Sequence, residues 1–148
     1  ALMAEAAELG GGERVLEVGT GSGYGAAVLA ELASEVWTIE RHAELVEGAR
    51  GVLERLGYAN VHVVEGDGSV GYPAAAPYDA IVVTAGAPQV PASLLDQLAD
   101  GGRLIMPVGP STYNQQLMRV RRAGDRLPSE RLGGVRFVPL VGTEGVAE

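Results

Sequence analysis

The sequence contains no cysteine and no lysine, and aromatic residues make up only 5% of it. Without cysteine the chain can form neither a disulfide framework nor a thiolate zinc site, so thiol chemistry is excluded. The formal net charge of -8 argues against a nucleic-acid duplex or an anionic membrane as the main partner, because both bind clustered cations. No run approaches the roughly 18 apolar residues of a membrane span, and the first residues lack the basic start of a signal peptide. We therefore expect a cytoplasmic protein.

The length and hydrophobic content indicate one globular domain over residues 1–148. With 47% hydrophobic residues, the chain can build a core without help from a metal or a disulfide. The chain begins at ALMAEAAEL, a helical pattern that lacks an initiator methionine. We therefore expect the domain to be N-terminally truncated, and the sequence leaves its oligomeric state open.

Apolar strands alternate with helical segments through the first two thirds of the chain. This alternation is typical of a doubly wound α/β fold, a Rossmann-like sheet whose strands are mostly parallel. The pattern predicts strands at residues 14–18, 35–39, 61–65, 78–84 and 103–108, and helices at residues 24–33, 42–56 and 90–99.

The last third of the chain breaks this alternation. Only a short linker, GPSTYN, separates the strand at 103–108 from the next apolar strand at 115–122, whereas a parallel crossover needs about a dozen residues. Strand six must therefore run antiparallel to strand five. A hairpin turn then leads to a seventh strand at 133–141, which Pro139 restricts to a sheet edge because proline cannot donate a ladder hydrogen bond. The predicted order is 3-2-1-4-5-6-7.

The stretch LEVGTGSGYG, residues 16–25, joins the first strand to the first helix through a glycine-rich turn. In a doubly wound sheet the ligand binds outside the carboxyl ends of the strands where the strand order reverses, and this turn lies there. A dinucleotide pattern, G-x-G-x-x-A, can be matched but is weak by itself. The better register is Glu17-x-Gly19-x-Gly21-x-Gly23, because a carboxylate ahead of the turn suits a cationic amine and would repel a pyrophosphate. This register favours S-adenosylmethionine over NAD.

Two further acids are expected at the carboxyl ends of neighbouring strands. Glu40 ends the second strand, where a carboxylate can accept hydrogen bonds from both ribose hydroxyls. Asp67 and Gly68 follow the third strand, where an acceptor can meet the adenine amino group and the glycine leaves room for the ring. With Glu17, acids stand at the ends of three consecutive strands, which indicates a nucleoside site.

The other polar residues are interpreted as structural. We expect His42 and His62 to have surface or packing roles and Asp79 to make a structural contact. Residues 84–87, TAGA, end the fourth strand on the ligand side. Several late arginines are predicted to form the solvated face of near-edge strands and not a binding patch, namely Arg119, Arg121, Arg122, Arg126, Arg131 and Arg136.

Several segments resemble the protein-L-isoaspartate (D-aspartate) O-methyltransferase family, in order along essentially the whole chain. They are VLEVGTGSGYGAAVLAEL, VWTIERH, GYANVHVVEGDGS, PYDAIVVTAGAPQVPASLLDQLADGGRLIMPVG and VRFVPLVG, and the combination of TIER, GDG and TAGAP is the most specific. The resemblance implies a methyltransferase fold with the last two strands exchanged. It also implies that Gly19, Ser22, Glu40, Asp67 and Gly68 occupy cofactor-binding positions.

The resemblance further implies a reaction, methyl transfer from S-adenosylmethionine to the α-carboxylate of L-isoaspartyl residues in damaged proteins. A carboxylate is already ionised at neutral pH, so no general base is required, and we assign neither a catalytic residue nor a metal site. Members of this family carry a further N-terminal segment with a serine-containing motif, which nothing here matches. We therefore expect this chain alone to bind the cofactor and to transfer little methyl. A non-catalytic S-adenosylmethionine-binding module and, third, an NAD-binding oxidoreductase are the alternatives.

Overall fold

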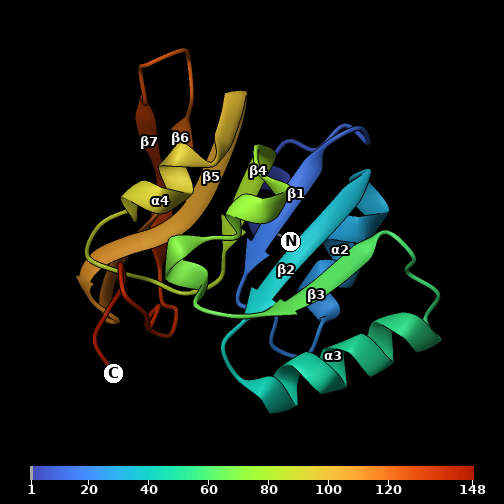
Figure 1. Ribbon diagram of the computed structural model, residues 1–148. Coiled ribbons are helices and arrows are strands. Elements are labelled where there is room, and N and C mark those ends of the chain that lie inside the picture. Colours follow the sequence, from blue (N-terminus) through green and yellow to red (C-terminus); the bar gives the residue numbers. More distant parts are fainter. Residues whose placement is uncertain (1) are drawn as a thin grey trace.

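A single twisted sheet forms the centre of the molecule in a computed structural model that describes residues 2–148 (Figure 1). Its strands are β1 (Arg14–Val18), β2 (Glu35–Glu40), β3 (Val61–Glu65), β4 (Tyr78–Val83), β5 (Leu98–Ser111), β6 (Asn114–Arg121) and β7 (Ser129–Val135). The helices are α1 (Leu2–Ala6), α2 (Tyr24–Leu32), α3 (Ala43–Arg55) and α4 (Ala92–Asp96), with short 3-10 turns η1 (Gly68–Val70) and η2 (Pro73–Ala75).

The strand order is β3-β2-β1-β4-β5-β6-β7, which confirms the predicted order. Strands β1 to β5 pair in parallel, and β6 is antiparallel to both β5 and β7. The reversal follows from the chain between β5 and β6, where Ser111 and Asn114 are paired across a tight turn that has no room for a crossover helix. The order reverses between β1 and β4, as expected for a doubly wound sheet.

The predicted position of the last strand is wrong. We expected residues 133–141, but β7 ends at Val135 and Pro139 lies outside it. The side chain of Gln115 on β6 accepts a hydrogen bond from the Phe137 N–H at 2.8 Å and donates to the Phe137 carbonyl at 3.2 Å. These contacts end the pairing of β7, and the chain then crosses to the end of β4, where the Leu140 N–H donates to the Gly86 carbonyl at 2.7 Å.

Two boundaries in the second half also differ from prediction. Strand β5 begins at Leu98, earlier than expected, and pairs with Tyr78 before a bulge. Helix α4 is correspondingly short and ends at Asp96, where the backbone passes into β5. Leu98 and Ala99, predicted as the end of a helix, therefore belong to β5.

Alternate residues of the strands face two separate hydrophobic layers. On β1, Val15 packs against α1, α2 and α3, whereas Leu16 and Val18 face the layer that contains Leu94 of α4. This alternation follows from the period of two along a strand. Figure 1 shows α2 and α3 on one side of the sheet and α4 on the other. No helix among residues 2–148 has the length and apolarity needed to cross a membrane.

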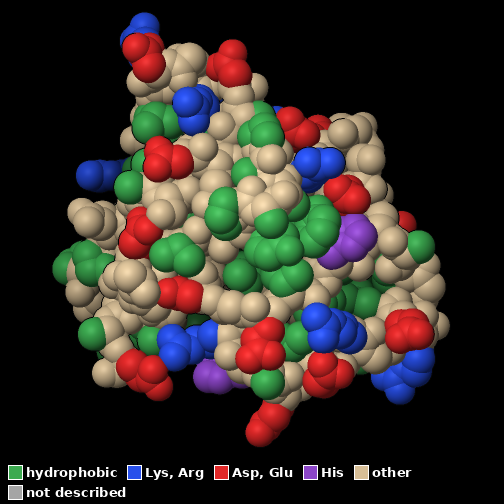
Figure 2. All heavy atoms as spheres, viewed as in Figure 1, with side chains coloured by type: hydrophobic (Ala, Val, Ile, Leu, Met, Phe, Trp, Pro, Cys, Tyr) green, Lys and Arg blue, Asp and Glu red, His purple; other side chains and the backbone are tan. Residues whose placement is uncertain are grey.

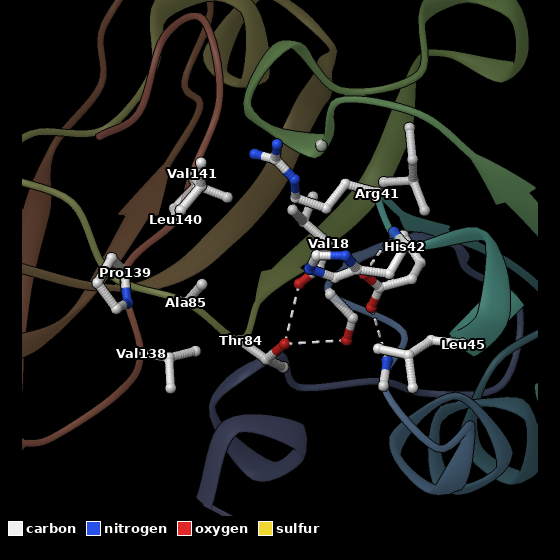
Figure 3. A pocket seen from close by; sticks show the side chains of 15 residues that line it. Val18, Arg41, His42, Leu45, Thr84, Ala85, Val138, Pro139, Leu140 and Val141 are labelled. Carbon is white, nitrogen blue, oxygen red and sulfur yellow. Dashed lines mark hydrogen bonds between the residues drawn. The ribbon is translucent and has the colours of Figure 1, made fainter. Parts of the chain in front are cut away.

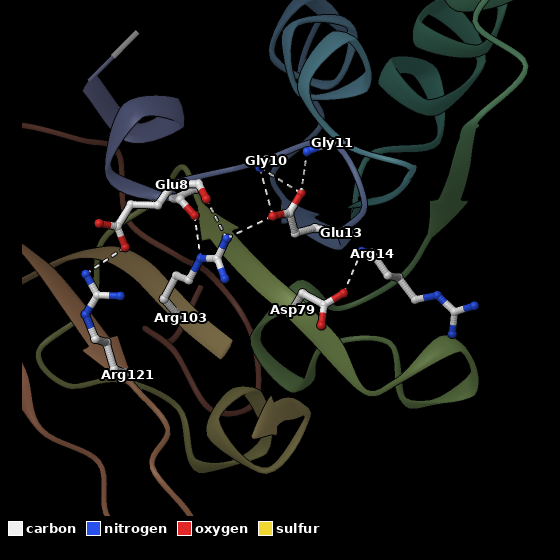
Figure 4. A network of polar contacts seen from close by, with 9 residues as sticks. Glu8, Gly10, Gly11, Glu13, Arg14, Asp79, Arg103 and Arg121 are labelled. Carbon is white, nitrogen blue, oxygen red and sulfur yellow. Dashed lines mark hydrogen bonds and ion pairs between the residues drawn. The ribbon is translucent and has the colours of Figure 1, made fainter. Parts of the chain in front are cut away.

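Arg103 of β5 is one of the residues that attach the segment around α1 to the sheet (Figure 4). The Arg103 guanidinium donates to the Ala7 carbonyl at 2.5 Å and to the Glu8 carbonyl at 2.7 Å, and it pairs with the Glu13 carboxylate at 3.3 Å. The same Glu13 carboxylate accepts hydrogen bonds from the Gly10 and Gly11 N–H groups. These polar contacts, near the amino ends of the parallel strands, fix the segment after α1 to the sheet.

The late arginines make structural contacts on the strands near the sheet edge. Arg119 pairs with Glu130 at 2.6 Å, and Arg121 pairs with Glu8 at 2.7 Å. Arg122 donates to the carbonyls of Leu95 and Leu98. Figure 2 shows acidic and basic side chains interspersed over the face that it presents. The exposed Arg126, Arg131 and Arg136 agree with the prediction of a solvated face, whereas Arg119, Arg121 and Arg122 are half-buried in these contacts.

Candidate functional site

A cavity of about 390 Å³ lies at the carboxyl ends of β1, β2 and β4, where the strand order reverses (Figure 3). Val138 to Val141 form one wall, and Arg41, His42 and Leu45 lie opposite to it. Val18, Ile39 and Ala85 also line the cavity. Of the residues that the sequence predicted to bind a cofactor, those that line this cavity are Gly19, Gly21, Glu40 and Gly68.

The glycine turn closes one end of the cavity with backbone atoms. Gly19 has a φ of 98°, in the region that favours glycine, and its N–H donates to the Ile39 carbonyl at 2.9 Å. A Cβ atom at Gly19 would overlap the hydroxyl of Thr84, whose single proton is shared between the carbonyls of Val18 and Gly19, each 3.0 Å away. The absence of a side chain here brings the turn and the end of β4 into contact and leaves the backbone accessible to a ligand.

Glu40 joins the glycine turn to the start of α3. One carboxylate oxygen accepts from the Gly21 N–H at 3.0 Å and the other from the His42 N–H at 3.1 Å. The side chain is buried, at 7% exposure, yet it lines the cavity. Because each carboxylate oxygen can accept two hydrogen bonds, both oxygens keep one acceptor position for a ligand.

Glu17 is not brought into this cavity. It pairs in register with Thr38 of β2 and points to the α2 and α3 side of the sheet, since strand alternation sends the neighbouring Val18 toward the cavity. It lines instead a second, mostly apolar cavity of about 320 Å³ beside α1, α2 and β7. Burial raises the pKa of the Glu17 carboxyl to about 7, helped by the charge of Glu40 and opposed by a hydrogen bond from Thr38.

Asp67 and Gly68 are adjacent in sequence but line different hollows. Gly68 lines the 390 Å³ cavity, whereas Asp67 borders a neighbouring hollow. The Asp67 carboxylate accepts from the Ser69 N–H and hydroxyl and from the Thr143 N–H at 2.9 Å. Burial alone would raise the pKa of this carboxyl, but these hydrogen bonds lower it. Asp67 therefore anchors the C-terminal segment beside the cavity.

Ser22 and Gly23, the remaining predicted site residues, also lie outside the cavity lining. Gly23 precedes α2 with a φ of 93° and Ser22 is exposed at the tip of the turn. Arg41 and Leu45 do line the cavity, although no sequence motif predicted a site role for them. The available signal was position, because Arg41 follows the strand-ending Glu40 directly.

Three other predicted roles can be compared with the structure. His42 is exposed but also lines the cavity. His62 stacks on Trp37 with ring centroids 4.2 Å apart and contacts Glu35, which confirms a packing role. Asp79 accepts from the Arg14 N–H at 2.9 Å, which confirms a structural contact.

Comparison with known proteins identifies the same family along almost the whole chain. The sequence model of the protein-L-isoaspartate(D-aspartate) O-methyltransferase family, PCMT, matches residues 1–145. The chain is 62% identical over 146 residues to protein-L-isoaspartate O-methyltransferase 2 of Pelobacter propionicus and 58% identical over 146 residues to protein-L-isoaspartate O-methyltransferase 1 of Geotalea uraniireducens. Each alignment covers 98% of this chain but only 65% and 67% of those proteins, so the chain spans about two thirds of their length.

Solved structures agree with the sequence comparison. A protein-L-isoaspartate O-methyltransferase structure superposes with a TM-score of 0.88 and 35% identity, covering 97% of this chain and 46% of that chain. A structure from Plasmodium falciparum, described as such an enzyme in complex with S-adenosyl-L-homocysteine, has a TM-score of 0.71 and 25% identity over 95% of this chain and 70% of that chain. The chain belongs to the protein-L-isoaspartate(D-aspartate) O-methyltransferase family.

Proposed function

We propose that this chain is the S-adenosylmethionine-binding domain of a methyltransferase that acts on the α-carboxylate of L-isoaspartyl residues in proteins. The observation that carries the proposal is the convergence of Gly19, Gly21, Glu40 and Gly68 on one cavity at the reversal of strand order. Membership of the family supports the substrate class. The other predicted site residues support the site without lining the cavity. Glu17 lies behind the cavity wall, Ser22 and Gly23 belong to the glycine turn, and Asp67 borders the neighbouring hollow.

The residues present fit an adenosyl cofactor. A volume of about 390 Å³ lies within the range of about 300–1,000 Å³ that is usual for ligand cavities. Apolar side chains, including Ile39, Leu45 and Leu140, can contact the faces of a flat base. Glu40 offers the free acceptor positions that two ribose hydroxyls need, and the glycine turn lets the backbone approach the ligand closely.

The chemistry requires positioning and exclusion of water. When bound, the cofactor supplies a methyl group that its sulfonium already activates. Glu40 and the glycine turn would hold and orient the nucleoside and the amino-acid part of the cofactor. Val138 to Val141 shield one side of the cavity from water. Such alignment of reactants can lower a barrier by about 7–11 kcal/mol without any group that transfers a proton.

Calorimetry with S-adenosylhomocysteine tests the cofactor site directly. The chain should bind S-adenosylhomocysteine and should not bind NAD. Glu40→Ala should weaken binding by about 1.5–3 kcal/mol, the range for hydrogen bonds to a charged group. Part of this loss comes from release of the Gly21 N–H, so Glu40→Gln, which keeps an oxygen acceptor, should have the smaller effect.

Glu65 offers a matched control for Glu40. It ends β3, pairs in register with Glu40 and is exposed, but it does not line the cavity. Glu65→Gln should leave the affinity for S-adenosylhomocysteine unchanged. Equal affinity for NAD, or equal loss in the Glu40 and Glu65 variants, would contradict the proposed cofactor site.

The substrate class is tested by transfer of tritiated methyl to a synthetic isoaspartyl peptide, with the aspartyl isomer as control. The assay compares the 148-residue chain with the same chain joined to the segment that the Pelobacter propionicus relative has beyond the matched region. The joined protein should methylate the isoaspartyl peptide and spare the aspartyl peptide. Cofactor binding without transfer in either protein would favour a binding module.

A further inference from the structure

Three buried hydroxyl and carboxyl groups connect the glycine turn to the centre of the sheet. The Thr38 hydroxyl donates to Oε1 of Glu17 at 2.7 Å, and its oxygen lies 2.6 Å from the Thr20 hydroxyl oxygen. A threonine hydroxyl has a single proton, so when Thr38 donates to the ionised Glu17 carboxylate, the contact with Thr20 uses the Thr20 proton. The contacts therefore form one directed chain from Thr20 through Thr38 to Glu17.

The chain of hydrogen bonds is built into the sheet and is shielded from water. Glu17 and Thr38 are register partners on β1 and β2, so their side chains leave the sheet on the same face. The exposed fractions are 2% for Glu17, 0% for Thr38 and 4% for Thr20. Hydrogen bonds between groups this deeply buried resist replacement by water, and a lost partner leaves a costly unpaired group.

The start of α2 leaves room for the Glu17 carboxyl. A methyl group on Gly25, the second residue of α2, would lie 2.5 Å from Oε2 of Glu17. The carboxyl is thus held between Thr38 and the first turn of α2, and its burial keeps its pKa near 7. Its facing titratable groups are Glu40 on β2 and Tyr24 on α2; the other side chains around the second cavity are apolar, apart from Thr84.

Thr20 is the residue through which this arrangement reaches the site. It stands between Gly19 and Gly21, both of which line the 390 Å³ cavity, while its own side chain points away from the cavity. Two residues of β2 that share one face therefore hold the turn at neighbouring points. Thr38 holds the Thr20 side chain, and Glu40 holds the Gly21 N–H.

We propose that Glu17, Thr38 and Thr20 are positioning residues for the cofactor, which hold Gly19 and Gly21 in the conformation that receives it although none of the three lines the cavity. The proposal rests on the proposed function. It gives Glu17 an indirect role, in place of the direct contact with a cationic amine that the sequence suggested.

Calorimetry with S-adenosylhomocysteine on paired variants tests the proposal. Thr38→Val removes the hydroxyl at nearly constant shape, and Thr38→Ser keeps it. One net hydrogen bond corresponds to about two- to tenfold in an equilibrium constant, and Thr38→Val also leaves buried partners unpaired. The dissociation constant should therefore rise about three- to tenfold. Thr38→Ser should remain within about twofold of the unchanged chain.

Val36→Ala is the control for loss of stability alone. Val36 is fully buried on the same strand and the same face as Thr38, and it pairs with Val15 and Val61, away from the turn. This variant should be less stable and should still bind within about twofold of the unchanged chain. If Val36→Ala and Thr38→Val weaken binding equally, the effect is only one of stability and the proposal is refuted.

Thr20→Val and Thr20→Ser repeat the test at the other end, in case Thr38→Val does not fold. Hydrogen exchange of the Gly21 and Gly23 amides provides a measurement that needs no ligand. Both valine variants should speed exchange at the turn and both serine variants should not. Equal affinity and equal exchange in the valine and serine variants would overturn the proposal. If the unchanged chain does not bind S-adenosylhomocysteine, the proposed function fails, and exchange alone decides whether the turn is held in this way.

Discussion

Replacing Glu17 by glutamine should remove a pH-dependent contribution to the free energy of unfolding. Burial raises the pKa of this carboxyl from 4.5 to about 7. A raised folded-state pKa means that the folded protein holds the proton more tightly, so its stabilising effect is complete below pH 4.5 and is lost as the pH rises through 7. At about 1.4 kcal/mol per pKa unit, the loss is about 3 kcal/mol.

Glutamine cannot titrate, and its amide oxygen can still accept the hydrogen bond from Thr38. The stability of the unchanged chain relative to Glu17→Gln should therefore fall by about 3 kcal/mol between acidic and mildly alkaline pH. Urea unfolding of both proteins from about pH 4.5 to pH 8 measures this difference. Carboxyls that do not interact with Glu17 cancel in this difference. A difference that stays constant over this range would refute the assignment of a raised pKa to Glu17.

Three further outcomes are expected. Arg103→Ala should lower the free energy of unfolding by about 1.5–3 kcal/mol because it removes charge-assisted contacts to the segment after α1, whereas Arg126→Ala, at an exposed position, should change it little in the same urea titration. Gly19→Ala should lower the free energy of unfolding by at least about 1–2 kcal/mol and weaken binding of S-adenosylhomocysteine. Gly48→Ala in α3 should not lower the free energy of unfolding. Asp67→Asn should be less stable than the unchanged chain at pH 7, by about 1 kcal/mol. This difference in stability should close as the pH falls below 3.8, because the hydrogen bonds that lower the pKa of Asp67 stabilise only its ionised form. The opposite sign in any of these comparisons would contradict the contacts described for that residue.

The strand order could be predicted because it depends on short-range features of the chain. Apolar periodicity located β1 to β4 to within a residue or two, and the length of the linker after β5 required β6 to reverse. The end of the sheet could not be predicted in this way. The pattern of residues 133–141 is typical of a strand, but at Phe137 the Gln115 side chain takes the place of a backbone partner, so the ladder between β6 and β7 ends at Val135.

Part of the candidate site could be predicted from residues that directly end or follow a strand. Gly19, Gly21, Glu40 and Gly68 were expected from their positions, and all line the cavity. The wall formed by residues 138–141 was not expected as part of the site, because it reaches the cavity only after the chain has left β7. Its place depends on contacts with Gly86, which are distant in sequence.

The sequence by itself determined the doubly wound fold, the strand order, the glycine turn and the acid at the end of β2, since each depends on periodicity, loop length or one local backbone conformation. Only the tertiary structure decided which acids face the cavity. Glu17 turns to a buried chain of hydrogen bonds with Thr38, and Asp67 is taken up by Thr143, 76 residues away. An acid at a strand end has the same sequence signature in either role, because the difference lies in partners that only folding brings within hydrogen-bonding distance.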